Sequence, residues 1–155
     1  MSDVTAETIA IVQNDWTAIR QNIKKNGVNF FIFFFKRNPE YQDMFQSMRG
    51  MSVAELSKSA ALRSHALRVM YAISSLVDNL SDDMDAVVEV LKKTTADHYP
   101  RGVTLIHYQN LFSTLVVFLG INLSSGFGDK NKAAWEALAG VMLGVIDGEL
   151  KVLMG

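Results

Sequence analysis

The chain has 155 residues, of which 49% are hydrophobic, and its 15 Lys and Arg against 16 Asp and Glu give a formal net charge of -1. This length favours one compact domain, and the balanced charge argues against nucleic acid as a main partner. The absence of cysteine excludes a disulfide framework, thiolate metal ligands and a catalytic thiol.

Apolar runs such as residues 30–35 and 137–146 are shorter than the roughly 18 to 20 residues that cross a bilayer, so we expect no membrane partner. The start Met1-Ser2-Asp3 lacks the basic residues and the apolar run of a signal peptide. The sequence therefore predicts a cytoplasmic protein.

Apolar residues recur mostly three and four positions apart, and prolines are rare, which predicts an all-α protein. In the first segment we expect Thr5 to cap a helix and Asn26-Gly27 to end it. The apolar face of this helix consists of Ile9, Val12, Trp16, Ile19 and Ile23.

The aromatic run at residues 30–35 has no clear period and a high β propensity, so in isolation it also fits a buried strand. A lone strand would leave its backbone unpaired, and no second strand candidate is evident. We therefore predict a buried helix that ends before Pro39, followed by short helical turns and an irregular connection over residues 39–57.

Four further helices are predicted: one at about residues 59–80, one that starts at residues 81–83 and ends at residues 100–102, and two at about residues 104–119 and 130–153. Ser81 is expected to cap the second of these, and Pro100-Arg101-Gly102 is expected to end it. No internal repeat or long charge run divides the chain.

Two of the three histidines, His65 and His98, lie at similar distances from the corner between their predicted helices. His65 lies 15 residues before Leu80, and His98 lies 16 residues after Asp82. At a rise of about 1.5 Å per residue, both lie about 23 Å from the corner between their helices, so an antiparallel pair would bring the imidazoles face to face. His107 lies beside the apolar face rather than on it, and we expect it on the surface.

Each histidine alone fits an ordinary role as a hydrogen-bonded core residue or a helix-end charge. A zinc site is poorly supported, because it asks for three or four ligands. A flat cofactor between the helices fits better, and haem is the obvious candidate. The phenylalanines at residues 30–35 and Phe45 fit either the walls of such a pocket or an ordinary core.

These residues resemble the globin family over nearly the whole chain, and specifically the intracellular haemoglobins of invertebrates. The resemblance rests on Pro39 with Phe45 six residues later, on His65 and His98, which are 33 positions apart, and on Trp16 in the first helix. Two stretches are most similar to bivalve mollusc haemoglobins: Leu62-Arg63-Ser64-His65-Ala66 with Met70-Tyr71-Ala72, and Gly126-Phe127-Gly128-Asp129-Lys130 leading to Ala134-Trp135.

The resemblance implies a globin fold, with helices A–H around a haem pocket, as a single domain over residues 1–155. The cofactor would be haem b, iron protoporphyrin IX. The resemblance also implies that His98 is the proximal iron ligand, with its other ring nitrogen held by a carbonyl or hydroxyl, and that His65 donates a hydrogen bond to bound O2.

Five further positions receive roles from the same resemblance. Phe45 would stack on the haem face, Val69 would crowd the distal ligand and Phe31 would roof the pocket. Lys93 and Arg101 would pair with the haem propionates, although each also fits a solvated helix-end charge.

The function implied is reversible binding of O2, and of CO and NO, without enzymatic turnover. The alternatives are a haem enzyme acting on NO or peroxide, a hexacoordinate redox sensor in which His65 itself binds iron, and a haem-free apolar carrier or interaction module with structural histidines. A homodimer or larger homo-oligomer is compatible with the sequence. In bivalve haemoglobins, however, an aromatic residue four positions before the proximal histidine takes part in cooperativity, and this chain has Thr94 there.

Overall fold

A computed structural model describes residues 4–155. These residues form eight α-helices, two short 3-10 helices and no strand, which confirms the predicted all-α class. The α-helices are α1 (Ala6–Arg20), α2 (Ile23–Arg37), α3 (Pro39–Gln42), α4 (Val53–Lys58), α5 (Ala60–Asn79), α6 (Met84–His98), α7 (Leu105–Leu123) and α8 (Asp129–Met154).

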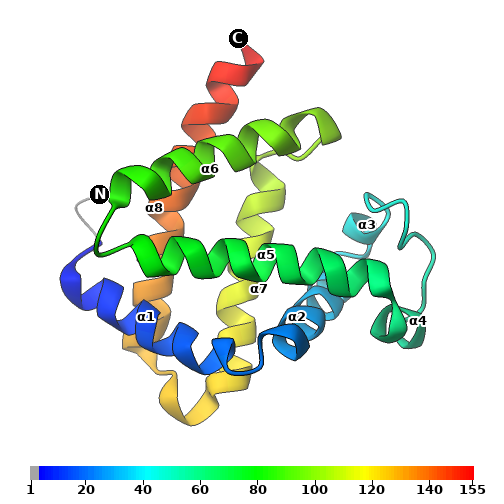
Figure 1. Cartoon of the computed structure of the whole chain (residues 1–155), viewed down its shortest axis with the longest axis horizontal. Helices are drawn as coiled ribbons and strands as arrows, with labels where there is room; N and C mark the ends of the chain where they lie inside the picture. Colours follow the sequence, from blue (N-terminus) through cyan, green and yellow to red (C-terminus); the bar gives the residue numbers. More distant parts are fainter. Residues whose placement is uncertain (1–3) are drawn as a thin grey trace.

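The helices cross one another around one core. Figure 1 shows α5 and α6 joined at a shared corner, with α8 passing across both of them in this view. The main contacts of α2 are with α5, and α8 packs against α1, α6 and α7. The α5–α6 pair is thus supported by α2 against α5 and by α8 against α6.

The end of the first helix differs from the prediction. Thr5 caps α1 as expected, accepting a hydrogen bond from the Thr8 amide at 3.2 Å, but α1 ends at Arg20 and a new helix begins at Ile23. Asn26 and Gly27 therefore lie inside α2. The side chain of Asn26 donates to the Ile19 carbonyl at 2.8 Å, adding a second partner to a carbonyl near the end of α1 that also accepts from the Asn22 amide at 3.3 Å.

Gly27 is buried where α2 crosses α5. A Cβ atom at this position would lie 2.8 Å from Met70 Cγ and 3.3 Å from Ala66 Cβ, both on α5. Glycine thus lets the two helices approach closely. The sequence pattern predicted that a helix ends at Gly27. In the structure Gly27 lies inside a helix, and close packing against α5 explains why glycine stands there.

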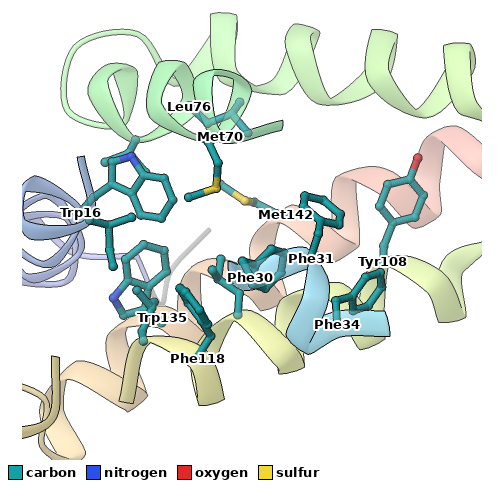
Figure 2. Packing of buried hydrophobic residues seen from close by; sticks show 14 of the residues in the cluster. Trp16, Phe30, Phe31, Phe34, Met70, Leu76, Tyr108, Phe118, Trp135 and Met142 are labelled. Carbon is teal, nitrogen blue, oxygen red and sulfur yellow. The ribbon is translucent and has the colours of Figure 1, made fainter. Parts of the chain in front are cut away.

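The aromatic run is helical, as predicted, and α2 ends at Arg37, shortly before Pro39. Four of its phenylalanines are buried: Phe30, Phe31, Phe34 and Phe35. Figure 2 shows Phe30 of α2 beside Phe118 of α7, whose ring centroids are 5.5 Å apart in an edge-to-face arrangement. Local β propensity is therefore overridden by burial on two sides of the helix.

Two tryptophans join α1 to α8 at the other end of the core. The rings of Trp16 and Trp135 lie 6.1 Å apart (Figure 2). Trp135 donates to the buried carboxylate of Asp15 at 3.0 Å, and Trp16 donates to Ser74 Oγ at 2.8 Å. Both buried indole N–H groups are satisfied, as burial requires.

The remaining boundaries are close to those predicted, with one change of cap. The carboxylate of Asp83, rather than Ser81, accepts from the Ala86 amide at 3.0 Å, because α6 begins at Met84. A carboxylate at this position also interacts favourably with the helix dipole. After His98 the chain forms a 3-10 turn and reaches Gly102, whose φ of +82° suits glycine, so the predicted end of this helix is confirmed.

Within residues 4–155, no single helix is long and apolar enough to cross a membrane. One pair of segments, Met84–Arg101 and Leu105–Gly126, reaches the required length and composition only together, with a bend of 119° between them.

The close approach at Gly27 predicts a position-specific loss of stability. Gly27→Val should lower the free energy of unfolding by about 1–3 kcal/mol, because the new methyl groups would overlap Met70 and Ala66. Gly144→Val is the matched control, since Gly144 lies in α8 with open space around it and valine has the higher helix propensity. Denaturant unfolding measures both, and equal stability of the two variants would contradict the role of the crossing.

Candidate functional site

A cavity of about 670 Å³, called here the histidine pocket, opens between α2, α5, the end of α6 and the start of α7. This volume lies within the roughly 300–1,000 Å³ typical of small-molecule and cofactor sites. Its lining consists of Phe31, Phe34, Tyr41, Met44, Phe45, Gln46, Ser47, His65, Arg68, Val69, His98, Arg101, Val103, His107, Tyr108 and Leu111. The structure thus brings His65 and His98 into one largely apolar space.

The ring of His98 is oriented by its own helix. Its Nδ1 lies 2.7 Å from the carbonyl oxygen of Thr94, one turn earlier in α6. A carbonyl oxygen only accepts hydrogen bonds, so Nδ1 carries the proton in this contact. In the neutral ring the lone pair is then on Nε2, which is the arrangement that a metal-ligating histidine requires.

His65 lies between two phenylalanines. Its ring centroid is 4.7 Å from the ring of Phe31 and 4.7 Å from the ring of Phe45. Burial lowers the pKa of His65 to about 4, and the positive charges of Arg68 and Arg101 act in the same direction. At neutral pH the ring is therefore uncharged, with one N–H donor available to a ligand in the pocket.

The other predicted site residues divide into two groups. Phe31, Phe45, Val69 and Arg101 line the histidine pocket. Lys93 is absent from the lining, and its exposed ammonium pairs with Asp97 at 3.2 Å. Lys93 and Asp97 can form this ion pair because they are four residues apart on α6 and so lie on the same face of the helix.

The charges around the pocket are of one sign. Arg68 and Arg101 are its charged lining residues, and the lining contains no carboxylate. In the part of the chain from residue 4 onward, no group of three or more His, Asp or Glu side chains is placed to hold a metal ion. The pocket therefore suits a group that brings its own metal ligands and carries negative substituents. Haem fits this donor set: one of the two histidines would hold its iron, and Arg68 and Arg101 would pair with its acidic groups.

The structure places His107 differently from the prediction. It was expected on the surface, but it is partly buried and lines the histidine pocket. Its Nδ1 accepts a hydrogen bond from the Thr104 amide at 2.8 Å, and its ring centroid lies 4.8 Å from that of Tyr41. This bond turns the ring back over the start of α7, a local contact that hydrophobic periodicity does not reveal.

Two more lining residues were missed, for different reasons. Arg68 follows His65 by three positions on α5, so helical spacing alone could have placed it on the same face. Tyr108 follows His107 in α7, and its hydroxyl is buried without a hydrogen bond to any residue in the described range. Burial raises the pKa of Tyr108, so the hydroxyl remains a potential donor at neutral pH.

Comparison with known proteins agrees with this geometry. The protein-family model for globins matches residues 28–146, which include both histidines. A globin of Nerita albicilla is 33% identical over 153 residues, covering 99% of this chain and 97% of its own length.

More distant relatives also match over most of their length. A globin of Aequiyoldia eightsii is 26% identical over 135 residues, covering 86% of this chain and 90% of its own length. Globin CTT-VIIB-6 of Chironomus thummi thummi is 29% identical over 137 residues, covering 87% of this chain and 81% of its own length. The all-helical architecture, the histidine pocket and these similarities together show that the chain belongs to the globin family.

Proposed function

We propose that residues 1–155 act as a single globin domain that binds O2 reversibly at a haem b in the histidine pocket, without enzymatic turnover. The observation that carries this proposal is that two histidines line one largely apolar cavity of about 670 Å³. The ring of His98 is oriented by a backbone carbonyl, and the ring of His65 is kept neutral by burial. Ferrous haem, when bound, supplies an iron site at which O2, CO and NO bind reversibly.

In this proposal His98 is the proximal ligand. The Thr94 carbonyl fixes the proton on Nδ1 and so presents Nε2 to the iron. Because the bond is local to α6, the ligand is already oriented in the folded chain. The ordering cost that would otherwise oppose cofactor binding is therefore reduced.

His65 is the proposed distal residue. It is held by Phe31 and Phe45, and its lowered pKa keeps it neutral, so it offers a single N–H donor rather than a charge. A neutral donor stabilises a polar diatomic ligand without acidifying the pocket. Phe31, Phe45 and Val69 form apolar walls that exclude water from the same space.

The proximal role of His98 is tested by removing its ring. His98→Gly should weaken haem retention by at least about 100-fold, since loss of even an outer-shell partner of a metal ligand costs about 10–100-fold. Added imidazole should restore binding by occupying the vacated space. The ratio of haem to protein after gel filtration measures both effects.

His107→Gly is the control for that variant, because His107 lines the same pocket but its Nδ1 is engaged by the Thr104 amide. It should retain haem. Equal retention by the His98→Gly variant and the unaltered chain would rule out His98 as the axial ligand.

The distal role of His65 is tested by His65→Leu. O2 release should become about 10–100-fold faster, because a hydrogen bond to a charged or strongly polar group contributes about 1.5–3 kcal/mol. Release of CO, a poorer hydrogen-bond acceptor, should change much less. Stopped-flow measurements with the two gases separate a lost hydrogen bond from a general opening of the pocket, and an unchanged O2 release rate would contradict the assignment.

Arg101 is the proposed partner of the haem propionates, since it lines the pocket. Arg101→Ser should accelerate transfer of haem to an acceptor protein several-fold. The matched variant Lys93→Ser should have little effect, because Lys93 is paired with Asp97 outside the pocket lining. Equal effects of the two substitutions would instead favour the sequence-based expectation that both residues act on the propionates.

A further inference from the structure

A second cavity lies on another part of the molecule. It has a volume of about 310 Å³ and lies between the start of α2 and the first half of α5. Its lining, called here the basic crevice, consists of Lys24, Lys25, Val28, Asn29, Arg63 and Leu67. Three cations and an amide thus surround an opening with two apolar residues, and none of the six is a carboxylate.

The cations of the basic crevice are not neutralised by neighbouring side chains. The ion pairs formed within residues 4–155 involve other cations, namely Arg20, Lys92, Lys93 and Lys151. The Arg63 guanidinium donates to the Lys58 carbonyl at 3.0 Å, which is a neutral acceptor. Like charges held together in this way repel one another, and in a chain with a net charge of -1 their grouping is not a consequence of overall composition.

Lys24 and Lys25 also occupy an unfavourable place in their own helix. They lie in the first turn of α2, which contains no acidic residue, and the N-cap residue Asn22 makes no side-chain capping hydrogen bond. Cations near a helix N-terminus oppose the helix dipole. The two lysines therefore destabilise the start of α2 electrostatically, and an anion bound in the crevice would offset this destabilisation.

The basic crevice is separate from the histidine pocket. The two cavities share no lining residue. On α5, Arg63 and Leu67 each stand two positions from His65, which at about 100° per residue places them on the opposite face of the helix. A ligand in the crevice would thus contact the back of the helix that carries the distal histidine.

We propose that the basic crevice binds a phosphate group carried by a small molecule. Three cations from two helices match the multiple charges and several acceptor oxygens of a phosphate, and the Asn29 amide adds a neutral donor. Val28 and Leu67 leave room for contact with an adjoining organic part. A soluble phosphate compound and a lipid headgroup share this chemistry.

The test uses calorimetric titration of the full chain with inorganic pyrophosphate at constant ionic strength. Saturable binding is expected for the unaltered chain. The double variant Lys24→Gln/Lys25→Gln should bind about tenfold or more weakly, because it removes two charge-assisted contacts. Arg63→Gln should also weaken binding, which distinguishes a crevice built from two helices from the end of α2 alone.

The control is Lys130→Gln/Lys132→Gln, which removes the same charge from two exposed lysines in the first turn of α8. It should change the affinity by less than about twofold, since neither lysine lines the crevice and salt screens exposed charges outside it. Absence of saturable binding, or equal weakening by the two double variants, would overturn the proposal. Circular dichroism of each variant establishes that the fold is retained.

A second arm identifies the source of the phosphate. Vesicles of phosphatidylcholine with phosphatidic acid are compared with vesicles of phosphatidylcholine alone. Capture by the acidic vesicles that pyrophosphate competes away, and that Lys24→Gln/Lys25→Gln abolishes, would support the site with a lipid headgroup as its source. If neither pyrophosphate nor the Lys24→Gln/Lys25→Gln substitution reduces capture by the acidic vesicles, the lipid binds elsewhere on the chain, which would contradict binding in the crevice.

Discussion

The close crossing of α2 and α5 at Gly27 is the contact on which the rest of the structure depends. Only a residue without a side chain allows the two helices to approach so closely, since a Cβ atom would lie 2.8 Å from Met70 Cγ. One turn after Gly27, Phe31 contacts the ring of His65. The same crossing therefore closes the core and sets one wall of the histidine pocket.

His65 and His98 differ in their local environments, and each environment determines where the ring carries its proton or whether the ring is charged. The Thr94 carbonyl determines which nitrogen of His98 is free, whereas burial between aromatic rings keeps His65 uncharged. Neither effect needs the cofactor to be present. The pocket is thus organised by the chain itself, with Arg68 and Arg101 making it positive at its edges.

Hydrophobic periodicity was sufficient to predict the helical class and the meeting of His65 and His98, because both depend on the repeat of 3.6 residues per turn. It was insufficient where one specific contact, rather than the helical repeat, decides where a residue lies. Gly27 reads as a helix end in sequence and is a packing contact in the structure. His107 reads as a surface residue, but a backbone amide turns its ring into the pocket. Lys93 precedes His98 by five positions in sequence, but its exposed ammonium pairs with Asp97 on α6 and does not line the pocket.

The visible absorption spectrum of the purified chain, reduced under anaerobic conditions after reconstitution with haem, tests the central claim most directly. The arrangement of His98 as ligand and His65 as free donor predicts one haem per chain and a single broad band, typical of five-coordinate ferrous haem, that changes reversibly when O2 is admitted. A colourless protein that does not take up haem would contradict the proposed cofactor. Sharp split bands, typical of two histidine ligands, would contradict the separate roles assigned to His65 and His98.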